Sequence, residues 1–304
     1  MARLILDGAR VLDGSGAPPL SDRAVVVEGD AIVEVGAAGA GGPGTRLDLG
    51  GRCLLPGLVN CHVHLCLTGD ADPVRLMAGE PVALTALRAA LHGRATVEAG
   101  VTTVRDLGGR EYAELAVRQA IRAGLMPGPR ILAAGKVICM TGGHGAWIGR
   151  EADGPDEVRK AAREQLKAGA DLIKVIATGG VMTPGVEPGA AQLGLDELRA
   201  AVAEARKAGR RVAAHAQGSQ GIADAVSAGV ASVEHGIFLT EEIVARMRAA
   251  GTALVPTLVA AERIATAPPE AGVPPWMIAK SQAVAASHVL SFQLAHRAGV
   301  TIAA

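Results

Sequence analysis

The chain has 304 residues, which is enough for one large domain with a sizeable core, or for such a domain plus a small accessory unit. Its 30 lysines and arginines balance 30 aspartates and glutamates, and only 2% of residues are aromatic, so nucleic acid and an anionic membrane are not expected partners. The four cysteines form no CxxC pair, and no signal sequence or membrane-spanning apolar segment is evident. We therefore expect a cytoplasmic protein with reduced thiols.

The first 53 residues have the pattern of a small β-sheet. Short β-type runs, at residues 4–6, 11–12, 24–27 and 32–35, are separated by turn residues such as Asp-Gly and Gly-Ser-Gly. The run over residues 23–35 predicts a hairpin that turns at Gly29 and Asp30. Because so small a sheet is marginal alone, residues 1–53 should form an N-terminal portion that packs against other structure.

From residue 54 onward, helical stretches alternate with apolar β-runs. In six places a glycine ends the helical stretch and a β-run follows at once: Gly100, Gly169, Gly209, Gly229, Gly251 and Gly299. The predicted strands cover residues 58–63, 101–106, 130–133, 171–176, 211–215, 230–235, 252–256 and 300–303. The main predicted helices cover residues 82–98, 155–168, 196–208, 240–250 and 280–298.

Such alternation of strands and helices predicts an α/β fold with a parallel sheet. Eight units in about 250 residues favour a closed (β/α)8 TIM barrel over residues 54–304. No Gly-x-Gly-x-x-Gly loop follows the first strand, which weakens the alternative of a dinucleotide-binding sheet.

Histidines and one lysine fall at the ends of four of the predicted strands. His62 and His64 are two residues apart on the first barrel strand, so their imidazoles share one face. Lys174, His215 and His235 fall on strands four, five and six, and the carboxyl ends of barrel strands meet at one rim. Four imidazoles are nitrogen ligands that suit zinc and neighbouring metals.

Lys174 is unusual because it interrupts an apolar strand. Burial lowers the pKa of a lysine, and a neutral amine could capture carbon dioxide as a carbamate whose two oxygens can bridge two metals. Alternatively, Lys174 reaches solvent or a carboxylate.

Other polar residues near these strands are expected to have structural roles. Arg105 and Asp106 should form an internal ion pair. We expect His92, His288 and His296 to be structural or surface residues, and Cys61 and Cys66 to be buried.

Four segments resemble the metal-dependent amidohydrolase superfamily: residues 55–64 (LPGLVNCHVH), 173–175, 212–216 and 233–236. Residues 140–145 and 177–182 resemble the branch of imidazolonepropionase-related enzymes and Xaa-Pro dipeptidases. The resemblance spans essentially the whole chain and implies a TIM barrel with an N-terminal β-sandwich portion.

The resemblance also implies a binuclear centre. His62 and His64 would bind one divalent metal, His215 and His235 the other, and carboxylated Lys174 would lie between them. We expect zinc, with a metal-bridging hydroxide as the nucleophile. His144, in a glycine-rich loop after strand three, would contact the substrate; the alternative is a solvent-exposed loop histidine.

The sequence departs from the pattern of the family that it resembles after strand eight, where these enzymes carry a catalytic aspartate. The chain stops at Ala304, so we expect a barrel incomplete after strand eight, an unassigned catalytic residue and little hydrolysis. On this interpretation it is a fragment of a longer enzyme or a decayed copy.

The function expected is hydrolysis of an amide or other C–N bond in a small, peptide-like substrate. A mononuclear deaminase on the same fold is the second hypothesis, disfavoured because Ala216, Gln217 and Gly218 follow His215 where a glutamate is usual. A catalytically dead metal-binding protein is the third. Exposed barrel helices and an incomplete sandwich are compatible with a homo-oligomer.

Overall fold

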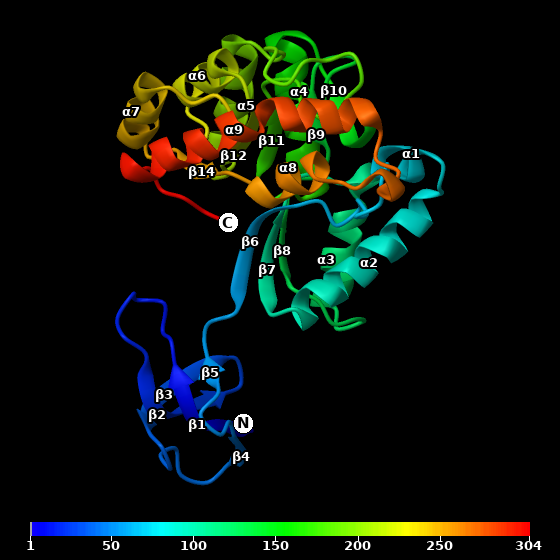
Figure 1. The fold of residues 1–304 in the computed structure, drawn as a ribbon. Helices are drawn as coiled ribbons and strands as arrows, with labels where there is room; N and C mark the ends of the chain where they lie inside the picture. Colours follow the sequence, from blue (N-terminus) through cyan, green and yellow to red (C-terminus); the bar gives the residue numbers. More distant parts are fainter. Residues whose placement is uncertain (1) are drawn as a thin grey trace. The chain divides into compact units, whose positions relative to one another are not determined.

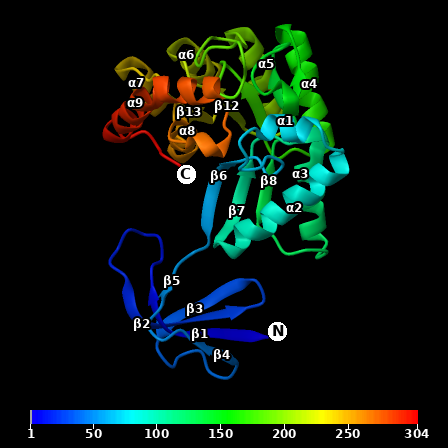
Figure 2. The same cartoon turned by 45° about the vertical axis from the view of Figure 1, so that its right-hand side comes forward.

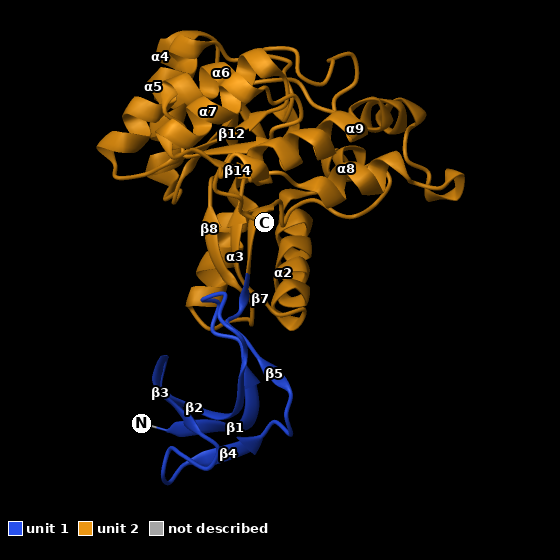
Figure 3. Cartoon of the chain, turned by 60° about the vertical axis from the view of Figure 1, so that its left-hand side comes forward, with its two compact units in different colours: residues 1–58 blue, residues 59–304 orange. Residues whose placement is uncertain are grey.

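The computed structural model describes residues 2–304, and its backbone separates into a first unit that ends at Leu58 and a second from Val59 to Ala304 (Figures 1 and 3). The first unit contains β1 (Arg3–Val11), β2 (Leu20–Glu28), β3 (Ala31–Ala37), β4 (Thr45–Asp48) and β5 (Cys53–Leu54). They form a five-stranded sheet in the order β3-β2-β1-β4, with β5 also paired to β1.

The N-terminal hairpin is confirmed, since β2 and β3 pair in antiparallel fashion around Gly29 and Asp30. The runs predicted separately at residues 4–6 and 11–12 belong to one strand, β1, whose register with β2 shifts after Leu6. Ile5 and Val26 are fully buried on this sheet, which gives the first unit a core of its own.

The second unit contains the remaining strands: β6 (Leu58–Val63), β7 (Val101–Asp106), β8 (Arg130–Ala133), β9 (Val137–Cys139), β10 (Gly149–Glu151), β11 (Ile173–Ile176), β12 (Val212–Ala216), β13 (Ser232–His235) and β14 (Ala253–Val255). They form two sheets, ordered β6-β7-β8 and β10-β9-β11-β12-β13-β14. Adjacent strands from β11 to β14 pair in parallel, as the alternating sequence predicts.

Backbone hydrogen bonds join the two sheets into the TIM barrel expected from the sequence. On one side, the Asp171 N–H donates to the Ala133 carbonyl at 2.8 Å, which links the segment just before β11 to β8. On the other, Leu254 of β14 exchanges hydrogen bonds with Thr301 and Ala303. The Cys61 N–H of β6 donates to the Ala304 carbonyl at 2.6 Å, so the last residues of the chain close the ring.

Helices surround this barrel: α1 (Pro73–Ala78), α2 (Val82–Glu98), α3 (Ala113–Arg122), α4 (Gly154–Ala168), α5 (Leu195–Lys207), α6 (Ser219–Ala228), α7 (Glu241–Ala250), α8 (Leu258–Ala265) and α9 (Pro275–Arg297). Three short 3-10 helices cover Arg110–Tyr112, Ala146–Ile148 and Pro269–Ala271. Figure 2 shows α2 and α3 beside β7 and β8. Over residues 2–304, no helix has the length and apolar character needed to cross a bilayer.

The predicted helices are confirmed with small shifts at their ends. The largest shift is in α9, which begins at Pro275 rather than residue 280, because proline is tolerated in the first turn, where its missing N–H is not needed. All six glycines at the predicted helix ends have positive φ, as the left-handed cap requires.

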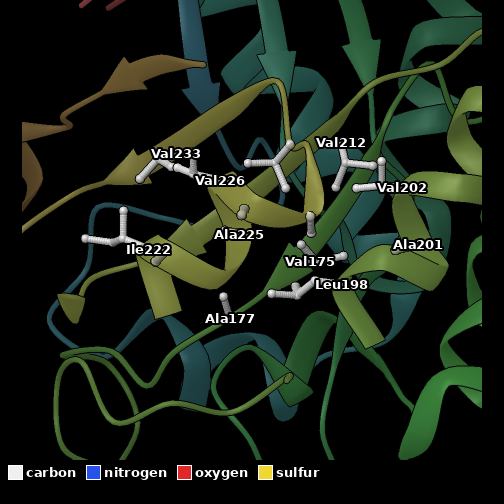
Figure 4. Packing of buried hydrophobic residues seen from close by; sticks show 14 of the residues in the cluster. Val175, Ala177, Leu198, Ala201, Val202, Val212, Ile222, Ala225, Val226 and Val233 are labelled. Carbon is white, nitrogen blue, oxygen red and sulfur yellow. The ribbon is translucent and has the colours of Figure 1, made fainter. Parts of the chain in front are cut away.

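Small and branched aliphatic side chains fill the space between the strands and the outer helices (Figure 4). Val175 of β11 and Val233 of β13 are fully buried there, with Leu198 of α5 and Ile222 of α6. This packing fixes the carboxyl ends of the strands, where the candidate residues lie. The four cysteines are free thiols: Cys53 is exposed, Cys61 half-buried, and Cys66 and Cys139 buried.

Candidate metal centre

All six candidate residues line one cavity of about 540 Å³ at the ends of the barrel strands: His62, His64, His144, Lys174, His215 and His235. The five histidine rings lie in a continuous row. Ring centroids are 5.4 Å apart for His62 and His64, 5.0 Å for His62 and His235, and 4.6 Å for His215 and His235. His144 continues this row, with its ring centroid 4.4 Å from that of His215. Side chains separated by up to 173 residues thus converge on one space.

His62 and His64 reach the cavity from the end of β6, because side chains two residues apart on a strand share a face. The Nδ1 atom of His62 lies 2.9 Å from Oε2 of Glu234, and Nδ1 of His64 lies 2.9 Å from the Gly108 carbonyl oxygen. A carbonyl can only accept a hydrogen bond, so Nδ1 of His64 carries the proton and Nε2 keeps its lone pair.

His235 ends β13 with φ at +73°, a left-handed conformation that interrupts the alternation of the strand. Its Nδ1 lies 2.6 Å from Oγ1 of Thr257, whose hydroxyl donates to the Pro256 carbonyl at 2.6 Å. The hydroxyl proton is therefore used elsewhere, and Nδ1 of His235 is the donor. Nε2 of His235 is left with its lone pair.

His215 is oriented the other way, because its Nε2 lies 3.0 Å from the Gly179 carbonyl oxygen. Its Nδ1 is therefore the nitrogen with a free lone pair. Among the described residues, each of the four histidines has one ring nitrogen hydrogen-bonded and one without a hydrogen-bond partner.

Lys174 is the second residue of β11 and lies deeper than the strand end that we predicted, because the strand continues through Val175 and Ile176. Its side chain is 2% exposed, and Nζ is a buried nitrogen without a hydrogen-bond partner in the described chain. Burial lowers the pKa of Lys174 to about 7; nearby Glu234 opposes this shift and Arg105 adds to it. The amine is thus partly neutral near pH 7.

The imidazoles are also held in their neutral form by burial. Desolvation lowers the pKa values of His62, His215 and His235 well below the ordinary value. Burial likewise lowers the pKa of His64 to about 4 and that of His144 to about 3. Neutral imidazoles are the form that binds metal ions.

Arg105 forms an internal ion pair, but its partner is Glu234 and not the expected Asp106. Nη2 of Arg105 lies 2.7 Å from Oε1 of Glu234, across the barrel from β7 to β13. Asp106 takes no part in this pair. It accepts the backbone N–H groups of Leu65 and Gly108 at 2.8 and 3.0 Å, and so orders the loop that follows His64.

His144 is buried rather than solvent-exposed and lines the cavity from the loop after β9. Nδ1 of His144 lies 2.7 Å from Oγ1 of Thr183, and its backbone N–H donates to Oε1 of Gln192 at 3.0 Å. Its ring stands at 88° to that of Trp147, with the centroids 5.3 Å apart. This histidine is therefore held in place from three sides.

Three residues of the centre were missed by the sequence analysis: Glu234, Thr257 and His288. His288, on α9, was expected to be structural or on the surface; it is buried, its Nε2 lies 2.6 Å from the Pro256 carbonyl oxygen, and it lines the cavity. His92 lies outside the cavity lining, with Nδ1 2.8 Å from the Leu65 carbonyl oxygen. The one sequence feature that could have indicated a role for Glu234 is its position next to His235.

The chemistry of these donors fits a metal centre that includes Lys174. Across residues 2–304, no three His, Cys, Asp or Glu side chains are arranged to hold a metal ion by themselves. The imidazoles and the unpartnered amine of Lys174 instead line the same cavity. Carboxylation of that amine would add two oxygen donors where the histidines alone are insufficient.

Comparisons with known proteins agree with this fold. Residues 53–304 match the amidohydrolase family. Ochratoxinase of Aspergillus niger is 34% identical over 278 residues, covering 82% of this chain and 57% of that protein. This chain therefore spans just over half the length of that curated relative.

Solved structures resemble nearly the whole chain. A prolidase complexed with N-methylphosphonate-L-proline is 35% identical with a TM-score of 0.92, covering 99% of this chain and 77% of that one. A Xaa-Pro dipeptidase with methionine bound in the active site is 30% identical with a TM-score of 0.88, covering 99% and 78%. These matches confirm the resemblance read from the sequence motifs, and the chain belongs to the amidohydrolase family.

Proposed function

We propose that this chain is a metal-dependent hydrolase of an amide or other C–N bond in a small substrate that carries a carboxylate. One observation supports this above all others: the buried, unpartnered amine of Lys174 lines a single cavity with four neutral histidines. An isolated buried amine is costly, and binding chemistry is the simplest reason to retain it.

In this proposal His62 and His64 would hold one divalent ion, and His215 and His235 would hold the second. Lys174 would supply a further ligand as a carbamate: its neutral amine would form a C–N bond to carbon dioxide as one C=O π bond opens to an oxyanion, and the nitrogen would lose a proton. A pKa of about 7 makes neutral amine available near pH 7. When bound, such ions polarise a carbonyl group and make water a better nucleophile; zinc suits this donor set.

The walls and rim of the cavity support a small amino-acid-like substrate. Apolar side chains form much of the lining: Leu67, Trp147, Ile176, Val181, Met182, Ile237, Ile264 and Met277. Arg263 of α8 is the cationic side chain at its exposed rim. A guanidinium binds a carboxylate through two parallel hydrogen bonds, so we assign the substrate carboxylate to Arg263.

The named relatives fit this assignment. The prolidase holds a proline derivative and the dipeptidase holds methionine, and amino acids of this kind carry a free carboxylate. N-acyl amino acids and dipeptides are therefore the substrates to test first. His144 would contact the reacting amide, because it is buried beside His215 and its Nε2 has no hydrogen-bond partner among the described residues.

Hydrolysis also needs a group that takes a proton from water. Among the described lining residues the one carboxylate is Asp70, which lies at the exposed rim. Binding of metal and of ligand therefore tests the proposal without depending on turnover.

The test is metal uptake with and without bicarbonate. Wild-type protein supplied with zinc and labelled bicarbonate should take up two ions per chain and show a carbamate carbon signal by NMR. Lys174→Met, an apolar replacement of similar length, should lose the carbamate signal and most of the bound zinc. Lys136→Met removes a surface lysine paired with Glu111 and should bind metal as wild type does. Wild-type protein that takes up no metal in bicarbonate would overturn the proposal.

A further inference from the structure

Glu234 is a fully buried carboxylate beneath the histidine cluster, and both of its oxygens are occupied. Oε1 accepts hydrogen bonds from Arg105 Nη2 at 2.7 Å and from Ser232 Oγ at 2.6 Å. Oε2 lies 2.9 Å from Nδ1 of His62. Ser232 and Glu234 are two residues apart on β13, so both point into the barrel, where Arg105 reaches them from β7.

Arg105 connects this carboxylate to the backbone of the strand that carries His62. Its Nε donates to the Cys61 carbonyl at 2.6 Å, and Nη1 donates to Ser232 Oγ at 2.9 Å. The contacts close a loop through β6, β7 and β13. Glu234 therefore has a fixed position relative to His62, rather than the freedom of a surface side chain.

The contacts of Glu234 also set the direction of its hydrogen bond to His62. In the ion pair with Arg105 its two carboxylate oxygens act as acceptors, Oε1 toward Arg105 and Ser232 and Oε2 toward His62. Nδ1 of His62 must then be the donor, and the lone pair lies on Nε2. His62 differs here from the other three histidines, which are held by the neutral oxygens of Gly108, Gly179 and Thr257.

We infer that Glu234, clamped by Arg105 and Ser232, is a positioning residue that holds His62 as the Nδ1–H tautomer and increases the basicity of its Nε2. A carboxylate behind a ligating imidazole strengthens the metal bond and orients the ring. This inference deepens the proposed function, on which it rests, because it assigns a difference in affinity between the two ions.

The first measurement needs no metal. In metal-free protein with labelled histidine, ring-nitrogen NMR should show His62 as the Nδ1–H tautomer, with the signal assigned from its loss in His62→Asn. In Glu234→Gln the side-chain amide can either donate or accept, so both tautomers of His62 should be present. An unchanged His62 tautomer in this variant would overturn the inference.

The second measurement is zinc affinity by competition with a chelator. Glu234→Gln should weaken one of the two ions about 10- to 100-fold and change the other little. Equal affinity to wild type at both sites would contradict the inference. Glu204→Gln is the matched control, because Glu204 is a largely buried carboxylate bound by Arg163 and Lys207 on the helical surface. It should alter neither the tautomer nor the affinity.

Removal of Glu234 leaves Arg105 buried without its partner, so the variant can fail to fold. Ser232→Ala keeps both charges and removes one hydrogen bond to Oε1. It should shift the His62 tautomer and zinc affinity in the same direction by a smaller amount, and no shift would contradict the inference. If wild-type protein binds no zinc, the proposed function fails, whereas the metal-free tautomer measurement still decides the role of Glu234.

Discussion

The four histidines of the centre differ in the group behind each ring. The Glu234 side chain holds His62, backbone carbonyls hold His64 and His215, and a threonine hydroxyl holds His235. In each case the partner fixes which nitrogen is free, so the tautomers are set before any ligand binds. The tautomers are fixed because the rings are buried; at the surface, water could replace each hydrogen-bond partner.

Thr257→Val tests this point at His235. Valine has nearly the same shape as threonine but cannot accept the hydrogen bond from Nδ1 of His235, which is 2.6 Å long. We expect zinc to bind less tightly at this histidine, by about tenfold, as for other partners of ligating imidazoles. Thr266→Val is the control, because its hydroxyl donates to a helix carbonyl on the surface. Chelator competition measures both variants, and equal losses would contradict the prediction.

Arg263→Gln tests the assignment of the substrate carboxylate. Trp147 lines the same cavity, so its fluorescence reports ligand binding without turnover. We expect the variant to bind an N-acyl amino acid about tenfold more weakly, while affinity for the corresponding amide stays unchanged, because only the acid has a charge to pair. Arg248→Gln, on α7 outside the cavity, should bind both ligands normally. A loss of equal size for acid and amide would contradict the assignment.

At the scale of elements, the turn after β13 holds His235 in place. Gly236 has φ at +62°, and a Cβ there would lie 2.5 Å from Cδ1 of Leu254, which is fully buried on β14. Two strands thus meet at a glycine next to a candidate ligand. The backbone at this position has no room for a side chain.

Gly236→Ala should therefore destabilise the fold more than Gly251→Ala. Both glycines have positive φ, at +62° and +69°, but nothing lies within 4 Å of a Cβ at Gly251. We expect the first variant to lose a further 1–3 kcal/mol or so, through overpacking against Leu254. Urea unfolding measures the difference, and equal losses would show that Leu254 moves aside freely. Zinc affinity should fall only in Gly236→Ala.

The elements could be predicted because their signals are local. The glycines that end helices, the apolar strands and the His-x-His spacing each lie within a few residues of sequence. The Arg105–Glu234 pair could not be predicted, because it joins strands 129 residues apart and depends on how the barrel closes. The depth of Lys174 could not be predicted either, because it depends on the register between β11 and β12. That register pairs Lys174 with Ala213, two residues before His215.

For the whole molecule, equal numbers of acidic and basic residues leave no large net charge to govern its response to pH. Buried groups should dominate instead. Glu114 of α3 is fully buried, and neither carboxyl oxygen has a hydrogen-bond partner within residues 2–304. Burial, with the nearby Asp106, raises the pKa of Glu114 to about 8.

The sign of the effect follows from proton binding. Between the ordinary pKa of glutamate, 4.5, and the raised value of about 8, the folded chain keeps a proton that the unfolded chain has released. Stability from this group is therefore present at low pH and is lost as pH rises through about 8. Glu114→Gln cannot ionise, so its Tm should fall less than that of wild type between about pH 5 and pH 8.5. Glu98→Gln, an exposed change on α2, should follow wild type; parallel curves for all three proteins would contradict the prediction.

The free cysteines offer a way to follow how the molecule opens. Cys53 is exposed, whereas Cys61 is half-buried in β6, with its N–H bonded to the Ala304 carbonyl. Burial raises the pKa values of the Cys66 and Cys139 thiols, which slows their reaction with alkylating reagents. The order of alkylation over time would then distinguish release of the final segment from β6, seen at Cys61, from loss of the interior, seen at Cys139.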